Sequence, residues 1–182
     1  MNFDFKNCTE EDLWKYIASE LSKNDIDVIL VGGAVVSIYT EGAYRSGDLD
    51  FVLNDLFRKK LNKIMNKLGF MQDGRFYKHP ECDHLFIEFV SFPASIGDDY
   101  SIKPDEIEYE GQILKIYSPT DCVRDRLASY AYFDARECLD QAVMVAKKQP
   151  VHFTRIKKWC DKERIQSKYQ DFIKEYKLAT QK

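Results

Sequence analysis

The strongest constraint on this chain of 182 residues is an apolar segment that runs into two glycines and, after fourteen further residues, into two alternating acids. The segment is Leu30-Val31-Gly32-Gly33, and the acids lie in Asp48-Leu49-Asp50-Phe51. Alternation is the period of a β-strand, so Asp48 and Asp50 project from one face, about 7 Å apart. Two neighbouring carboxylates repel each other unless a cation lies between them, and glycines let the backbone turn sharply and approach a ligand closely. The pattern predicts a phosphate-binding turn beside a divalent metal site.

This combination resembles the signature of the nucleotidyltransferase superfamily, a group that includes DNA polymerase beta, the kanamycin-modifying enzymes and the AbiEii-like bacterial proteins. The signature is an apolar residue followed by Gly-Gly or Gly-Ser, a spacer, and Asp-apolar-Asp or Asp-apolar-Glu on a strand. Here the spacer is slightly longer than usual. Arg45-Ser46 is similar to the run before the acids in minimal AbiEii-like members, which we expect to be closest to this chain. The resemblance implies an α/β (α+β) fold with a mixed sheet flanked by helices.

The resemblance also implies a third acid on a neighbouring strand, and Glu88 in the apolar run Leu85–Val90 fits this place. A lone buried charge is expensive unless a metal or a basic partner offsets it. We expect Asp48, Asp50 and Glu88 to hold Mg²⁺ or Mn²⁺, because hard cations prefer carboxylate oxygens. Glu88 would also be the general base. The alternative for Glu88 is an edge-strand acid that faces water.

Candidate nucleotide-binding residues surround these acids in the sequence. The backbone N–H groups of Gly32 and Gly33 would hold the triphosphate of ATP or another nucleotide. Ser37 would add a hydroxyl, or is simply a small packed residue. Arg45 and Ser46 would reach phosphate oxygens from the loop, although Arg45 is equally well explained as an exposed loop arginine.

Two later segments are similar to helices of AbiEii-like proteins. Pro119–Ala128 resembles the helix that carries a lysine, and Arg126 stands where the lysine is expected. Arg136–Asp140 resembles an Arg/Lys-Asp-x-x-Asp helix, with Glu137 in place of the first aspartate. Both changes keep the charge but alter reach and hydrogen-bond geometry. We predict that Arg126 binds nucleotide. A surface charge network on the two helices is an equal alternative.

The pattern of apolar residues predicts an α/β core over residues 1–117 and a helical C-terminal part over 118–182. Thr9-Glu10-Glu11-Asp12 is a capping box that opens a helix. Strands are expected at 27–31, 48–53, 70–77, 85–92 and 113–117, with a turn at Asp73-Gly74. Helices are expected at 34–39, 55–68, 120–132, 134–148, 154–163 and 165–178. We expect no strand after residue 117.

Charge and cysteine content limit the partners. Residues 147–182 hold eleven Lys and Arg against four Asp and Glu, so this tail is basic although the whole chain has a net charge of −3. The favoured explanation of the basic tail is a solvated helical face, and the alternative is a patch that binds nucleic acid, such as RNA, or an acidic partner. The five cysteines show no Cys-x-x-Cys pair. With no run of apolar residues long enough for a membrane helix and no signal-peptide pattern at the start, we expect a reduced cytoplasmic protein without a membrane partner.

His79, Cys82 and His84 lie close together in the segment 78–84. A zinc site is conceivable there. The spacing fits no closed pattern of four ligands, however, and no fourth ligand is evident. A polar hairpin loop is the favoured interpretation.

We therefore expect a metal-dependent nucleotidyltransferase that moves a nucleoside monophosphate from a nucleoside triphosphate to a hydroxyl acceptor. The acceptor would be a small molecule, an RNA end or a protein side chain. The alternative is a nucleotide-binding regulatory or toxin–antitoxin component with little turnover.

Overall fold

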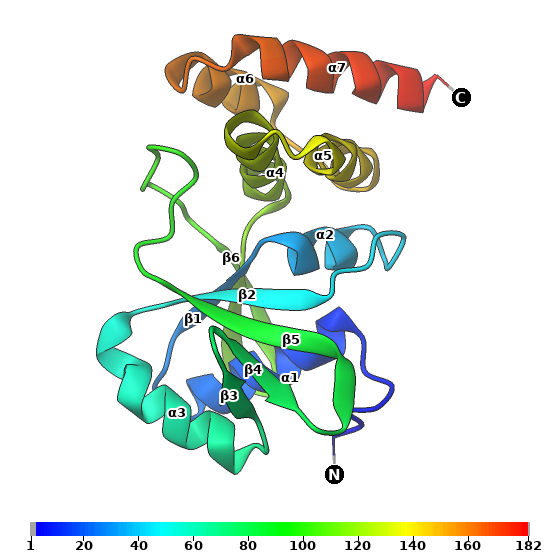
Figure 1. The fold of residues 1–182 in the computed structure, drawn as a ribbon. Coiled ribbons are helices and arrows are strands. Elements are labelled where there is room, and N and C mark those ends of the chain that lie inside the picture. Colours follow the sequence, from blue (N-terminus) through cyan, green and yellow to red (C-terminus); the bar gives the residue numbers. More distant parts are fainter. Residues whose placement is uncertain (1–2, 182) are drawn as a thin grey trace.

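The computed structural model describes residues 3–181, which contain a seven-stranded mixed sheet in the order β3-β4-β5-β2-β1-β7-β6 (Figure 1). The strands are β1 (Val28–Val31), β2 (Asp48–Leu53), β3 (Met71–Asp73), β4 (Phe76–His79), β5 (Cys82–Ser91), β6 (Asp105–Tyr109) and β7 (Gln112–Ile116). The helices are α1 (Glu10–Ser22), α2 (Gly33–Tyr39), α3 (Arg58–Lys67), α4 (Pro119–Phe133), α5 (Arg136–Lys148), α6 (Phe153–Lys162) and α7 (Gln166–Thr180), with a short 3₁₀ turn η1 (Asp55–Phe57) before α3. This architecture confirms the predicted α/β fold.

Helix α1 begins where the capping box predicts. The Thr9 hydroxyl accepts a hydrogen bond from the Asp12 backbone N–H at 3.2 Å, and the Asp12 carboxylate accepts one from the Thr9 N–H at 2.9 Å. These reciprocal bonds satisfy two donors that a helix start leaves free. The apolar stripe of α1 is fully buried against the sheet.

The centre of the sheet explains why the acids of β2 face one way. Strand β2 pairs antiparallel with β1 and parallel with β5. Leu49, Phe51 and Leu53 are completely buried on one face of β2. Because side chains alternate along a strand, Asp48 and Asp50 lie on the opposite face.

The predicted strands need one correction. The turn expected at Asp73-Gly74 is present and joins β3 to β4, which pair antiparallel. Strand β6 was not predicted at all. It pairs antiparallel with β7 at the edge of the sheet, and most of its side chains are exposed. Three acids in five residues and no buried face remove the alternating apolar pattern that identifies a strand.

The four C-terminal helices lie on the side of the sheet where α2 lies, whereas α1 and α3 lie on the other side (Figure 1). The chain passes from the end of β7 to α4 through Tyr117 and Ser118 only. Gln149 at the end of α5 donates a hydrogen bond from Nε2 to the Tyr39 carbonyl at the end of α2, at 3.0 Å. One continuous hydrophobic core extends from α1 to Phe172 in α7. The helical part is therefore packed on the α/β core.

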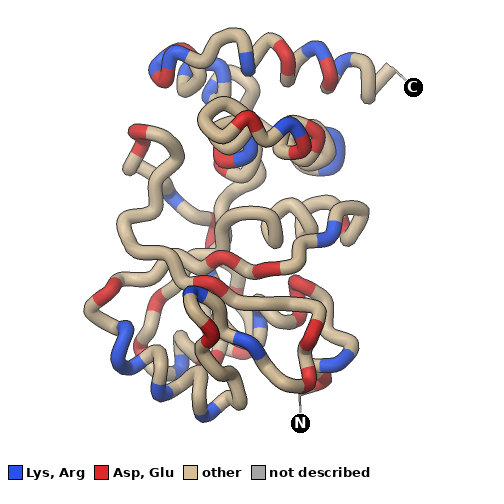
Figure 2. Tube along the Cα trace, viewed as in Figure 1, with Lys and Arg blue, Asp and Glu red and all other residues tan. Residues whose placement is uncertain are grey.

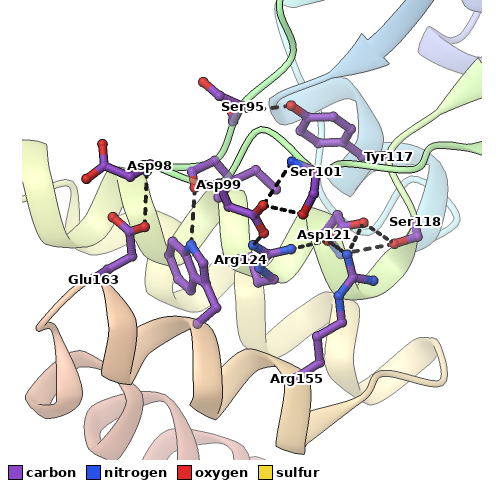
Figure 3. Close-up of polar contacts among 12 residues, drawn as sticks. Ser95, Asp98, Asp99, Ser101, Tyr117, Ser118, Asp121, Arg124, Arg155 and Glu163 are labelled. Carbon is purple, nitrogen blue, oxygen red and sulfur yellow. Dashed lines mark hydrogen bonds and ion pairs between the residues drawn. The ribbon is translucent and has the colours of Figure 1, made fainter.

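A group of buried ion pairs also joins the C-terminal helices to the long segment between β5 and β6. Arg124 of α4 is only 1% exposed, and its guanidinium lies between Asp99 of this segment and Asp121 of α4 (Figure 3). Its Nη1 is 2.6 Å from Asp121 Oδ1, and Arg155 of α6 approaches the same oxygen at 2.8 Å. We call Asp99, Asp121, Arg124 and Arg155 the arginine network. Nearby, Trp159 Nε1 donates to the Ile96 carbonyl at 3.1 Å.

Figure 2 shows basic and acidic residues interleaved along α6 and α7. Lys157 is 2.8 Å from Asp161 within α6, and Arg136 of α5 is 3.4 Å from Glu175 of α7. The basic C-terminal residues thus share their surface with acids, as the solvated-face interpretation expects. Between residues 3 and 181, none of the helices combines the length and the apolar character needed to cross a bilayer.

Candidate active site

Three carboxylates meet on one face at the centre of the sheet. In the register of β2 and β5, Asp50 lies directly beside Glu88, and on its other side Asp50 is paired with Val31, the residue before the glycines. Asp48 lies two residues earlier on β2 and is also partly buried. The sheet therefore brings the three predicted acids, which come from two segments 38 residues apart, to one place. We call Asp48, Asp50 and Glu88 the acid cluster.

Asp50, in the middle of the acid cluster, has a strongly raised pKa. Burial raises its pKa to about 7, and the negative charges of Asp48 and Glu88 add to this shift. Arg126 opposes the shift by favouring the ionised form. A carboxyl group whose ionisation is opposed first by burial and then by its acidic neighbours is a group that a cation would ionise.

Gly32 leaves room for the Asp50 side chain. Its φ of +75° lies in the left-handed region, and a Cβ built on it would stand 2.4 Å from Asp50 Oδ2. No other residue fits there without displacing the carboxylate. Gly33, the first residue of α2, is similarly close to the loop before β2, because a Cβ there would stand 2.8 Å from Ser46 Oγ. The two glycines thus bring bare backbone against the acid cluster.

Glu88 has a basic partner from the β3–β4 turn. Arg75 Nε is 3.4 Å from Glu88 Oε2, and the Glu88 side chain is 17% exposed. In the part of the chain that the structure describes, the three carboxylates are not among the groups whose ligand atoms all lie within 4.8 Å of one another. The donor set, which consists of Asp50 and the two carboxylates on either side of it, nevertheless has the oxygen ligands that a hard divalent cation prefers.

The loop before β2 is fixed by Glu10, a residue that the sequence analysis did not select. Glu10 is buried, and its carboxylate accepts hydrogen bonds from the Ser46 N–H at 2.8 Å and from Arg45 Nη1 at 3.0 Å. The buried Ser37 hydroxyl also bonds to it. Ser46 Oγ donates to Asp48 Oδ1 at 3.1 Å. Of these candidates, only Ser46 contacts the acid cluster, whereas Ser37 and Arg45 contact Glu10.

Helix α4 brings Arg126 and its neighbour Asp125 toward the acid cluster. Arg126 Nη2 is 2.5 Å from Asp125 Oδ2, and Nη1 is 3.4 Å from Gln141 Oε1 of α5. Burial alone lowers the pKa of Arg126, but Asp125 reverses this and raises it. Asp125 and Arg75 were missed, because a charged pair within one helix or across a turn has no pattern of its own. Glu137 and Asp140 of α5 are exposed.

Comparison with known proteins rests on structure. No protein-family model matches this chain, and no curated protein matches it at a significant level. Residues covering 75% of the chain superpose on 74% of an antigenic nucleotidyltransferase-like protein from Paracoccidioides brasiliensis, with a TM-score of 0.54 and 21% identity. The lincomycin-bound lincosamide antibiotic adenylyltransferase LnuA is similar over 79% of this chain and 99% of its own, with a TM-score of 0.52 and 16% identity. The fold is that of the nucleotidyltransferases. The antibiotic-resistance factor ANT(2'')-Ia is also similar, over 91% of both chains, with a TM-score of 0.50 and 11% identity.

Proposed function

We propose that this protein is a nucleotidyltransferase that uses Mg²⁺ or Mn²⁺ to move a nucleoside monophosphate from a nucleoside triphosphate to a hydroxyl acceptor. The observation that carries the proposal is the position of Asp50, which lies between Asp48 and Glu88 and against the bare backbone of Gly32. The motif around Arg45-Ser46 and the helices that carry Arg126 and Glu137 support a place near the minimal AbiEii-like members.

The acid cluster provides the metal ligands. Asp48, Asp50 and Glu88 would hold the cation, and Asp50 would lose its proton as the cation binds. A bound Mg²⁺ would neutralise the phosphate oxygens and the developing charge on the attacking and leaving groups. Asp48 is oriented for this role by the hydrogen bond from Ser46.

Glu88 is the proposed general base. It would accept the proton of the acceptor hydroxyl as the oxygen attacks the α-phosphate and pyrophosphate leaves. The Arg75 guanidinium forms an ion pair with Glu88, with 3.4 Å between Arg75 Nε and Glu88 Oε2. Because Arg75 is 70% exposed, it can leave this pair without unfolding the sheet.

The triphosphate would lie along the backbone of Gly32 and Gly33, whose N–H groups can approach it closely because no Cβ intervenes. Arg126 would supply positive charge from α4, since it already acts on Asp50 electrostatically. Ser37 and Arg45 are assigned instead to the Glu10 contacts that fix the loop.

ATP and a small hydroxylated acceptor are the first substrates to test, because LnuA is an adenylyltransferase of a lincosamide antibiotic. All five cysteines are free and buried, which supports the expectation of a reducing compartment.

The deciding experiment measures release of pyrophosphate and transfer of label from each of the four α-labelled nucleoside triphosphates, with Mg²⁺ or Mn²⁺. RNA, small alcohols and the protein itself are offered as acceptors. We expect transfer that Asp50→Asn removes and that the surface variant Asp73→Asn keeps. Tight nucleotide binding without any transfer would favour the regulatory alternative. In that case the ion pair between Arg126 and Asp125 would help to explain the lack of turnover, because it already engages the Arg126 guanidinium.

A further inference from the structure

A cluster of two cysteines and one histidine lies away from the acid cluster, where the segment before α1 meets the start of β5. Cys8 Sγ is 3.9 Å from Cys82 Sγ, and Cys82 Sγ is 3.9 Å from His84 Nδ1. All three ligand atoms lie within 4.8 Å of one another, the only such group of His, Cys, Asp or Glu among residues 3–181. Cys82 and His84 alternate on β5 and so project to one side, and Cys8 comes from 74 residues earlier.

We propose that Cys8, Cys82 and His84 form a zinc site that joins the N-terminal segment to the sheet. This inference does not depend on the proposed transferase activity.

The distances match the size of a zinc ion. Zinc–sulfur bonds of about 2.3 Å and zinc–nitrogen bonds of about 2.0–2.1 Å at tetrahedral angles place two sulfurs about 3.8 Å apart, and a sulfur and a nitrogen about 3.6 Å apart. The observed 3.9 Å separations are within a few tenths of an ångström of these values. Thiolate and imidazole ligands together favour zinc over Mg²⁺ or Ca²⁺.

A hydrogen bond holds His84 in the tautomer that leaves Nδ1 free to bind a metal. His84 Nε2 is 2.9 Å from the Cys8 carbonyl oxygen, which can only accept a hydrogen bond. Nε2 therefore carries the proton, and Nδ1 presents its lone pair toward the thiols. A metal-bound histidine usually makes this bond from its other nitrogen to a backbone carbonyl or carboxylate. Here the carbonyl belongs to Cys8, itself a proposed ligand.

The fourth position would face solvent. Cys8 and Cys82 are buried, whereas the His84 side chain is 41% exposed. Cys8 and His84 line a surface cleft of about 370 Å³ that also contains Arg45 and Ser46. Three protein ligands and one open position leave room for water or a small anion.

His79 is not part of the site, although it precedes Cys82 by only three residues. Its ring stacks on Phe5 with centroids 3.7 Å apart and also packs against Phe70. Cys8, from 74 residues earlier, takes the place that the sequence pattern offered to His79, and no local pattern could show this contact. His79 is also a matched control for His84, in the same hairpin.

The test titrates reduced, chelator-treated protein with Co²⁺ and Zn²⁺. We expect one equivalent of Co²⁺ with the charge-transfer absorption of thiolate ligands, displaced by Zn²⁺. Cys8→Ser should remove this absorption, and His84→Gln should weaken affinity at least about 10–100-fold, the range found when even a supporting residue is lost. His79→Gln should bind as the wild type does. Asp50→Asn should keep the thiolate absorption, which separates this site from the acid cluster.

Wild-type protein that binds no Co²⁺, or binds it without thiolate absorption, would overturn the proposal whether or not the variants fold. Equal affinity in folded Cys8→Ser would also overturn it. A third contrary result is a Cys8–Cys82 disulfide under mild oxidation in a protein whose reduced form takes up no metal. In that case the two thiols are an ordinary buried pair.

Discussion

Two groups of carboxylates in this protein have opposite electrostatic balance. In the arginine network, two arginines face two aspartates, and Asp121 is completely buried between them (Figure 3). In the acid cluster, three carboxylates converge, and the nearest cations are the exposed Arg75 and Arg126, which already pairs with Asp125.

The pKa shifts express the same contrast. Bonds from Ser101 and the charge of Arg124 hold the pKa of Asp99 well below its ordinary value. Burial and like charges raise the pKa of Asp50 to about 7. The arginine network pairs both of its carboxylates with guanidinium groups in the folded chain, and within the described part of the chain Arg124 Nε is its one buried side-chain atom without a hydrogen-bond partner. The acid cluster instead holds carboxylates whose mutual repulsion destabilises the folded chain, and on our proposal a bound cation would offset that repulsion.

The largest effect is expected from Asp50→Asn. The amide cannot supply the negative charge that the cation needs, so binding of metal–nucleotide should be abolished while the fold is kept. Isothermal titration with Mg²⁺ and nucleotide would measure this, with Asp73→Asn as a control because Asp73 is an exposed acid on the same sheet. Asp48→Asn should behave as Asp50→Asn does. Unchanged affinity would show that the acid cluster is not a metal site.

Glu88→Gln should reduce the single-turnover rate by about 10²–10⁴ while nucleotide affinity changes much less, because glutamine keeps the shape but cannot accept a proton. A parallel loss of affinity and rate would make Glu88 a metal ligand alone. A rate within a few fold of the wild type would leave it a structural acid. Glu106→Gln, on the far edge of the same sheet, is the matched control and should have no effect.

Arg124→Gln should break the arginine network and lower the free energy of unfolding by about 3–5 kcal/mol, because Asp121 is left buried with less compensation. Chemical denaturation would measure it. Arg155→Gln should cost less, since Arg155 is 44% exposed. If both variants keep wild-type stability, the arginine network does not stabilise the fold and the proposed contrast with the acid cluster is wrong.

The contributions of the two groups to the stability of the folded protein should change with pH in opposite directions. The folded-state pKa of Asp50 is above its unfolded value, so its contribution is fully present below about pH 4 and is lost as the pH rises to about 7. One pKa unit is worth about 1.36 kcal/mol, and solvent screening at this half-buried group reduces the total, so we expect a loss on the order of 2 kcal/mol.

Thermal melts of metal-free protein between pH 4 and pH 8 would show this loss, and Asp50→Asn should remove it. The pKa of Asp99 is lowered instead, so its contribution is present above its ordinary pKa and is lost as the pH falls below it. A wild-type stability that rises steadily from pH 4 to pH 8, unaltered in Asp50→Asn, would contradict the assignment.

The smallest effect is expected from Arg45→Gln. The Arg45 side chain is 66% exposed although that of its partner Glu10 is only 3% exposed. Glu10 keeps its hydrogen bond from the Ser46 N–H when Arg45 is replaced, so we expect a stability loss of about 1 kcal/mol. Nucleotide affinity should change by less than about fivefold. A loss of 100-fold or more would return Arg45 to the nucleotide site.

Local patterns predicted the parts of the site that local geometry determines. The period of β2 determines which face Asp48 and Asp50 occupy, and the Gly32 turn needs only a residue without a Cβ. The apolar run around Glu88 was enough to place it on a strand, and adjacent strands then brought it beside Asp50.

What the sequence could not show depends on contacts across long separations. Glu10 meets Ser46 across 36 residues, and Arg124 meets Asp99 across 25. The spacing of charged residues along a sequence does not indicate which of many oppositely charged residues each one will contact in the fold. Strand β6 is a different case, because the sequence does contain Glu110-Gly111 directly before the predicted strand at 113–117. In the structure both residues have positive φ and form the turn of a hairpin. A turn in this position indicates a partner strand on its N-terminal side, which is where β6 lies.

The acidic character that concealed β6 has a consequence for how copies of this protein meet. Edge strands offer unpaired N–H and C=O groups to any other strand, and charged side chains discourage that pairing. Strand β6 carries Asp105, Glu106 and Glu108 along one open edge, and β3 at the other edge is only three residues long. Charge repulsion at the β6 edge and the short length of β3 at the other edge therefore disfavour pairing with the sheet of another molecule. Acidification below about pH 4 neutralises such carboxylates, so the β6 edge is where self-association would begin in acid.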